Sequence, residues 1–243
     1  MTMERIDDLQ LKGLRIIQDS DLFCFGTDAV LLADFAHLCR RARVADLGTG
    51  TGILPLLLFG RREDITVQAI ELQDELFALA RRSVDMNGLG NNIQIVHGNI
   101  KAARALLDGV FDTVVSNPPY EQENAGIHSG NESHRIARFE VAVTFEELCV
   151  SVRELLRSGG RFECIHRSSR SAELFTTLKK HGLEPKDVRF IHSFAHSPSA
   201  QVLISAVKDG HEGINVMPPL IVHNDDGTET TEVRKIYHRK NEE

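Results

Sequence analysis

Three glycines and an acidic residue stand close together in the segment VADLGTGTG at 44–52. Glycine has no Cβ, so such a turn lets backbone N–H groups approach a ligand closely. The start of the helix predicted behind it favours polar or anionic groups. The spacing is GxGxG, whereas the dinucleotide fingerprint GxGxxG needs its last glycine where Ile53 stands. Asp46 would repel a pyrophosphate and attract a cation, so the turn favours a ligand with an ammonium group.

A second acidic residue, Glu71, ends the next predicted strand. A carboxylate at that place can accept hydrogen bonds from both hydroxyls of a ribose. The ligand thus has a ribose, a cationic group and no evident phosphate, and S-adenosylmethionine meets all three conditions. Asn99 and Ile100 end the third predicted strand and are placed to frame the adenine ring, although Asn99 alone is equally typical of a turn.

The segment VVSNPPY at 114–120 ends a predicted buried strand with two prolines, which keep the chain from starting a helix. Asn117 is then held at the end of the sheet. Its side-chain carbonyl and the backbone carbonyl of Pro118 can accept both hydrogens of one planar NH₂ group. Tyr120, after Pro119, offers a face on which a flat base can stack. The motif predicts a site for an uncharged amine on an sp² carbon, which needs positioning rather than a base; a plain strand-ending turn is the alternative.

Strand and helix patterns alternate from Arg43 onward, which predicts an α/β fold with a mostly parallel sheet and helices on both faces. The loop before the last strand is too short for a parallel crossover, so the final pair is expected to be antiparallel. The strand with NPPY should lie beside the glycine-turn strand and face the same crevice. Expected strands are 44–48, 66–72, 93–99, 111–116, 161–167, 188–194 and 201–207, and expected helices are 51–62, 74–89, 101–107, 144–157 and 169–181.

Two segments flank this predicted core at 43–208. Residues 1–42 include an apolar helical stretch at 28–38, for which Thr27 or Asp28 is a good N-cap. Residues 209–243 read as a polar extension whose charged end predicts a solvated helix, with a basic arm for tRNA as the alternative.

The net charge of -7 means that any nucleic-acid contact must come from a local basic patch. The apolar runs are too short to span a bilayer, and no leader-like segment opens the chain. We therefore expect a cytoplasmic protein without a membrane partner. No spacing of ligand residues predicts a metal site, and the oligomeric state is left open.

DLGTGTG, IEL and NPPY together resemble the class I S-adenosylmethionine-dependent methyltransferases that methylate amino groups. The resemblance covers roughly residues 44–208 and implies a Rossmann-like, seven-stranded sheet whose last strand is antiparallel. One departure is Asn99, where many relatives have an aspartate. The expected cofactor contacts are Gly26, Thr27, Asp46, Gly48, Thr49, Gly50, Glu71, Leu72, Asn99, Ile100 and Asn117, and the expected catalytic residues are Asn117, Pro118, Pro119 and Tyr120.

The segment LKGLRIIQDSDLFCFGTDAVLLADF at 11–35 is similar to bacterial enzymes that methylate N6 of the adenine next to the anticodon of a valine tRNA. This resemblance implies that residues 26–28 fold over the cofactor and that the substrate is RNA, most simply tRNA. Arg135 and Arg138 follow the loop after NPPY and are expected to hold RNA phosphates.

NPPY specifies the kind of nitrogen and not the molecule that carries it. A protein glutamine N5-methyltransferase and an enzyme for another RNA base amine are the alternatives. A nicotinamide oxidoreductase would need GxGxxG, and a non-catalytic RNA-binding module would need basic or aromatic surface stripes.

Overall fold

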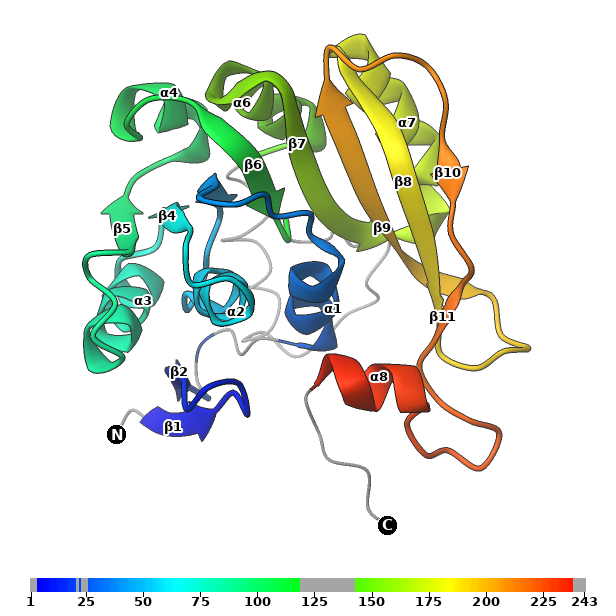
Figure 1. Cartoon of the computed structure of the whole chain (residues 1–243), viewed down its shortest axis with the longest axis horizontal. Helices are drawn as coiled ribbons and strands as arrows, with labels where there is room; N and C mark the ends of the chain where they lie inside the picture. Colours follow the sequence, from blue (N-terminus) through cyan, green and yellow to red (C-terminus); the bar gives the residue numbers. More distant parts are fainter. Residues whose placement is uncertain (1–3, 21, 23–25, 119–142, 238–243) are drawn as a thin grey trace, which may run out of the picture.

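The β-branched segments of the sequence become the strands of one large sheet in the computed structural model, which describes residues 4–20, 22, 26–118 and 143–237 (Figure 1). Within these residues the sheet has nine strands in the order β10-β8-β9-β7-β6-β3-β4-β5, and β11 also pairs with β8. The strands are β3 (Arg43–Leu47), β4 (Thr66–Glu71), β5 (Ile93–His97), β6 (Phe111–Ser116), β7 (Leu156–Arg167), β8 (Leu183–His192), β9 (Ser199–Lys208), β10 (Asn215–Val216) and β11 (Leu220–Ile221).

The expected antiparallel pair is confirmed. β9 lies between β7 and β8 and runs antiparallel to both, while the neighbouring strands from β7 to β5 pair in parallel. The expected count of seven strands holds for the long strands and is too low for the whole sheet. The extra strands, β10 and β11, have two residues each and pair in parallel with β8. Both come from the extension after Lys208, and the prolines at 218–219 separate them because proline cannot donate to a strand ladder.

Helices cover both faces of the sheet, as predicted. One buried cluster joins α1, α2 and α8 to Val44, Val115 and Ile165 of the strands. The opposite cluster joins α4, α6 and α7 to the alternate residues of the same strands. The helices are α1 (Thr27–Phe35), α2 (Ile53–Arg61), α3 (Asp74–Met86), α4 (Ala103–Leu106), α6 (Phe145–Leu155), α7 (Ser171–Lys180) and α8 (Thr231–Ile236), with short 3₁₀ helices η1 (Ile100–Ala102) and η2 (Ser168–Arg170).

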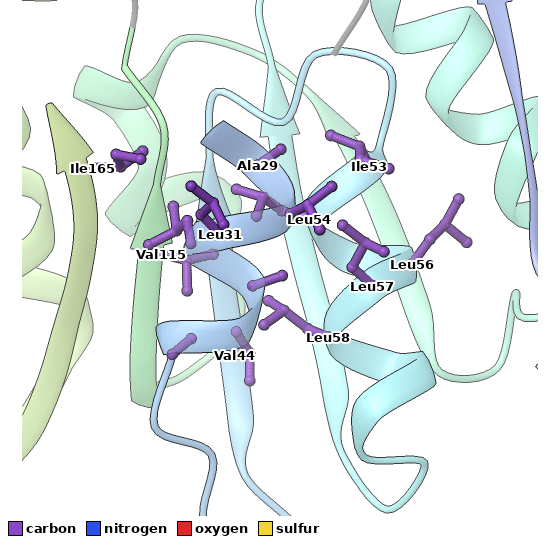
Figure 2. Close-up of a cluster of buried hydrophobic side chains, with 14 of the residues drawn as sticks. Ala29, Leu31, Val44, Ile53, Leu54, Leu56, Leu57, Leu58, Val115 and Ile165 are labelled. Atoms are coloured by element: carbon purple, nitrogen blue, oxygen red, sulfur yellow. The ribbon is translucent and has the colours of Figure 1, made fainter. Parts of the chain in front are cut away.

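The helix after the glycine turn is buried on nearly every side, which suits its sequence ILPLLLFGR. Pro55 lies in its first turn, where a missing N–H costs nothing. Figure 2 shows Leu54 and Leu58 of α2 beside Leu31 of α1, packed over the strand residues Val44 and Val115. This packing fixes both helix starts, and therefore the glycine turn, above the carboxyl ends of β3 and β6.

Two flanking segments contain structure that the sequence patterns did not reveal. Residues 4–19 form a hairpin of β1 (Glu4–Asp8) and β2 (Arg15–Asp19). It is tied to α3 by Ser83 Oγ, which accepts from the Ile17 N–H at 3.0 Å. The predicted C-terminal helix is present and partly exposed, but it is not solvated on every side: Val233 of α8 is only 1% exposed and packs in the same cluster as α1.

Candidate active site

The turn after β3 adopts backbone angles that glycine takes readily and other residues do not. Gly48, Gly50 and Gly52 have φ of 81°, 59° and 86°. The Gly48 N–H donates to the Ile70 carbonyl at 3.0 Å, which ties the turn to β4. A Cβ added to Gly52 would lie 3.2 Å from the Cβ of Ala80 in α3, whereas one added to Gly50 would meet nothing within 4 Å. The turn is therefore closed toward α3 and open at Gly50.

Asp46 lies at the end of β3, fully buried. Within the described residues, neither of its carboxylate oxygens has a hydrogen-bond partner, and the buried hydroxyl of Thr49 has none either. Burial raises the pKa of Asp46 to about 7; the nearby Thr49 hydroxyl opposes the rise and the negative Glu71 adds to it. A buried carboxylate without donors is costly, and a bound ammonium group would remove that cost.

Glu71, at the end of β4, is 5% exposed but well supplied with donors. Its Oε2 accepts from the Gly50 N–H and its Oε1 from the Gln73 N–H, each at 2.8 Å. Burial raises the pKa of Glu71 and these backbone N–H groups oppose the rise. Each carboxylate oxygen can accept a second hydrogen bond, so the fixed carboxylate can take two neighbouring hydroxyls. Next to it, Leu72 leaves 42% of its surface exposed.

Asn99 follows β5 and has a local partner. Its Oδ1 accepts from the Lys101 N–H at 2.9 Å and so caps η1. The turn role that the sequence allowed is therefore present, and Oδ1 has one lone pair left for a ligand. Ile100 contacts the glycine turn, since its Cδ1 lies 3.5 Å from the position of a Cβ on Gly48.

Asn117 follows β6 directly, and the strand register brings it to the glycine turn. Asp46 pairs with Val115, so two residues further on Asn117 lies level with Gly48. Ser116 strengthens this junction: its buried hydroxyl donates to the Leu47 carbonyl at 2.8 Å. Ser116 is not among the site residues predicted from the sequence. A small hydroxyl residue just before NPPY was the available signal.

The remaining expected site residues divide into two groups. Gly26 is the N-cap of α1 and Thr27 its first residue, but no side chain caps the helix. The prediction that Thr27 or Asp28 serves as the cap is therefore wrong; Gly26 takes that place in extended geometry, with φ -103° and ψ -176°. Pro119, Tyr120, Arg135 and Arg138 lie outside the described residues.

A second buried acid, Glu163 of β7, lies at the same level of the sheet. Val115 pairs with both Asp46 and Glu163. Glu163 Oε1 accepts from the His37 N–H at 3.2 Å and from Ser205 Oγ at 3.1 Å, and it lies 3.1 Å from His37 Nδ1. Burial raises the pKa of Glu163, and the hydrogen bond to Glu163 raises the pKa of His37. This acid fastens the residues after α1 to the sheet.

The chain belongs to the methyltransferase small domain family, whose model matches residues 21–181. It is 30% identical to the tRNA1(Val) (adenine(37)-N6)-methyltransferase of Cronobacter sakazakii over 72% of this chain and 70% of that one. It is 28% identical to the Christiangramia forsetii protein of the same name over 81% and 82% of the two chains.

Solved structures agree on the fold. A predicted O-methyltransferase from Agrobacterium tumefaciens superposes with a TM-score of 0.70 at 24% identity, over 87% of this chain and 97% of that chain. Across the described part of the chain, no helix is both long and apolar enough to cross a bilayer. The same residues contain no group of three or more histidine, cysteine or acidic side chains arranged to hold a metal ion.

Proposed function

We propose that this methyltransferase moves a methyl group from S-adenosylmethionine to N6 of an adenine in RNA, specifically in a tRNA next to the anticodon. The observation that carries the proposal is the junction of β3 and β6. It brings Asn117, the residue proposed to bind the amine, level with Gly48 of the turn beside the unpartnered carboxylate of Asp46. Cofactor and amine would then meet at one edge of the sheet.

The residues of the turn fit S-adenosylmethionine. Asp46 would receive its ammonium group, because that carboxylate is buried without a donor. Glu71 would accept its ribose hydroxyls, and Gly50 leaves room for close approach. When bound, the cofactor supplies a methyl group on a positively charged sulfur. The further residues proposed to hold it are Gly26, Thr27, Gly48, Thr49, Leu72, Asn99, Ile100 and Asn117, with residues 1–42 as a cover and 43–208 as the cofactor-binding core.

The amine would be held by two acceptors and no base. Asn117 Oδ1 and the Pro118 carbonyl can each accept one N–H of an exocyclic NH₂ group. They would turn its lone pair toward the methyl group and stabilise the positive charge that develops on nitrogen. Positioning of this kind supplies about 7–11 kcal/mol of a transfer barrier. A lysine ammonium, which has no lone pair, would not be a substrate.

The choice of RNA rests on the relatives, both of which are named for adenine-37 N6 methylation of tRNA1(Val). Three residues outside the described ranges keep their predicted roles in the proposal. Tyr120 would stack on the adenine, following the rigid pair Pro118-Pro119. Arg135 and Arg138 would hold RNA phosphates, since the net charge of -7 leaves RNA binding to local patches.

The test combines the purified protein, S-adenosylmethionine with a tritiated methyl group, and bacterial tRNA that lacks adenine N6-methylation. Label that is released as N6-methyladenosine on digestion of the tRNA is the expected result. Label in a protein fraction and none in tRNA would replace the RNA proposal with glutamine methylation. Label in tRNA that is released as another methylated base would keep RNA and reject adenine.

Asn117→Ala tests the amine site in the same assay. Turnover should fall by about three orders of magnitude, because the acceptor that orients the amine is lost. Affinity for S-adenosylmethionine, measured by calorimetry, should stay within a few fold. Asn215→Ala in β10 is the matched control, since it removes an exposed asparagine five strands away from β3 in the sheet. Normal turnover in Asn117→Ala would refute the proposed role.

A further inference from the structure

Three aromatic rings gather beyond the carboxyl end of β8. Phe194 and His196 belong to the turn between β8 and β9, and His223 follows β11. The rings of Phe194 and His196 are stacked, with centroids 5.7 Å apart and planes at 21°. The Phe194 and His223 rings lie 5.5 Å apart at 35°. The side chain of His196 is 76% exposed, so this aromatic platform, Phe194, His196 and His223, presents a flat ring to solvent.

Backbone and side-chain hydrogen bonds hold the platform in place. Ser197 Oγ accepts from the Phe194 N–H at 3.0 Å, which closes the turn. His192 Nδ1 lies 2.7 Å from the Ser197 carbonyl. The segment after β11 is fastened by the His223 N–H, which donates to the Ser193 carbonyl at 2.9 Å. The rings are thus arranged before any ligand binds, which lowers the entropy lost on binding.

The platform and the candidate active site both lie at the carboxyl ends of the parallel strands. β8 runs parallel to β7 and β6, since β9 is antiparallel to β7 and to β8. Figure 1 shows the β8–β9 turn and the loop before α8 at the end of the sheet toward which β6 points. Three strand spacings, or about 14 Å, separate β6 from β8 across the sheet. The strand register sets Asn117 level with Arg189, and Phe194 lies five residues, or about 17 Å, further along the chain. A few nucleotides of a single-stranded loop can span such a separation.

We propose that the aromatic platform stacks a base of the RNA loop that flanks the adenine held at Asn117, an inference that rests on the proposed function. Unpaired RNA loops are recognised through bases stacked on aromatic side chains, histidine included. The nearby charge favours a base over the RNA backbone: Asp225 Oδ1 lies 3.7 Å from His196 Nδ1 and would repel a phosphate. Phe194 supports the His196 ring from within, and His196 supplies the contact.

The experiment measures binding of a tRNA anticodon stem-loop to His196→Ala, His196→Phe and His211→Ala, with wild type as reference. Loss of one stacked base should weaken RNA binding about 5-fold or more. His196→Phe should restore wild-type affinity, because a flat ring is kept. His211→Ala should bind as wild type does, because His211 is exposed near Lys186 at the other end of β8.

A fluorescent base analogue, 2-aminopurine, placed in turn at each loop nucleotide identifies the stacked base. One position should lose fluorescence on binding to wild type and regain it in His196→Ala. Equal affinities of His196→Ala and wild type, or a loss that His196→Phe does not rescue, would overturn the platform. The wild-type arm separates the two proposals: if wild type methylates and binds the RNA while His196→Ala is unaffected, only the platform fails.

Discussion

Two buried acids at one level of the sheet differ in what surrounds them. Glu163 has donors from His37 and Ser205 on one carboxylate oxygen, whereas within the described residues Asp46 has none on either. Burial raises the pKa of both. A buried charge is tolerated when the protein supplies partners and is costly when it does not. The difference separates an acid that fastens two segments of the fold from one that we propose receives a ligand.

The sharpest test of this comparison is Asp46→Asn. The change keeps the shape of the side chain and removes the charge that would pair with an ammonium group. A charge-assisted hydrogen bond is worth about 1.5–3 kcal/mol, so S-adenosylmethionine should bind about 10- to 150-fold more weakly by calorimetry. The free protein should become more stable, because a desolvated carboxylate is removed. A variant that binds normally and unfolds at a lower temperature would assign Asp46 to the fold instead.

The same acid predicts a pH dependence. Burial raises the pKa of Asp46 to about 7 from an ordinary value of 3.8. The free protein should therefore lose stability as the pH rises between these two values, because the folded state resists ionisation. Binding of an ammonium group needs the ionised form, so cofactor affinity should rise by about 10-fold between pH 6 and pH 8. Calorimetry across this range should show the rise in wild type; a rise that persists in Asp46→Asn would come from another group.

Removing His37, the partner of Glu163, should lower the stability of the protein slightly and leave cofactor binding unchanged. His37→Ala removes a donor from Glu163, and because 44% of the His37 side chain is exposed the loss should be only about 1 kcal/mol in the free energy of unfolding. The hydrogen bond raises the pKa of His37, so its contribution is complete below about pH 6.5 and is lost as the pH rises through the raised value.

Urea unfolding at pH 6 and pH 9 measures this contribution, with His211→Ala as the exposed control. The difference between wild type and His37→Ala should be larger at pH 6. Cofactor affinity should be unchanged in both variants. A loss of cofactor affinity in His37→Ala, with stability intact, would reverse the roles assigned to the two acids.

The glycine turn and the strand ends around it could be predicted from the sequence because their signals are local, whereas their roles toward a cofactor stay a proposal. The glycine turn, the acids at strand ends and the asparagine before two prolines each lie within one short segment, and the parallel sheet brings the strand ends together. The cap of α1 was mispredicted for a local reason as well: several suitable residues stand in a row, and propensity alone does not choose between Gly26 and Thr27.

The rest depends on contacts between distant segments. In the sequence Glu163 is only an acidic residue in a predicted strand. Its partners, His37 after α1 and Ser205 of β9, come from distant segments and appear only in the structure. Val233 stands in a charged segment, yet α8 packs it against α1. The two-residue strands β10 and β11 are too short for any periodicity to show. Their pairing is decided by the exposed edge of β8.

The position of β9 bears on the order in which the molecule can be completed during synthesis. The first half of the sheet, β3 to β6, contains or adjoins the glycine turn, Asp46, Glu71 and Asn117, and its strands are neighbours that need no later segment to pair. β8 cannot join, because the strand between it and β7 is the last long strand in the chain. A nascent chain that ends before Ser199 would leave β7 with an open edge. The glycine turn, which would hold the cofactor, is therefore synthesised well before β9 can pair β8 with the rest of the sheet and so fix the aromatic platform.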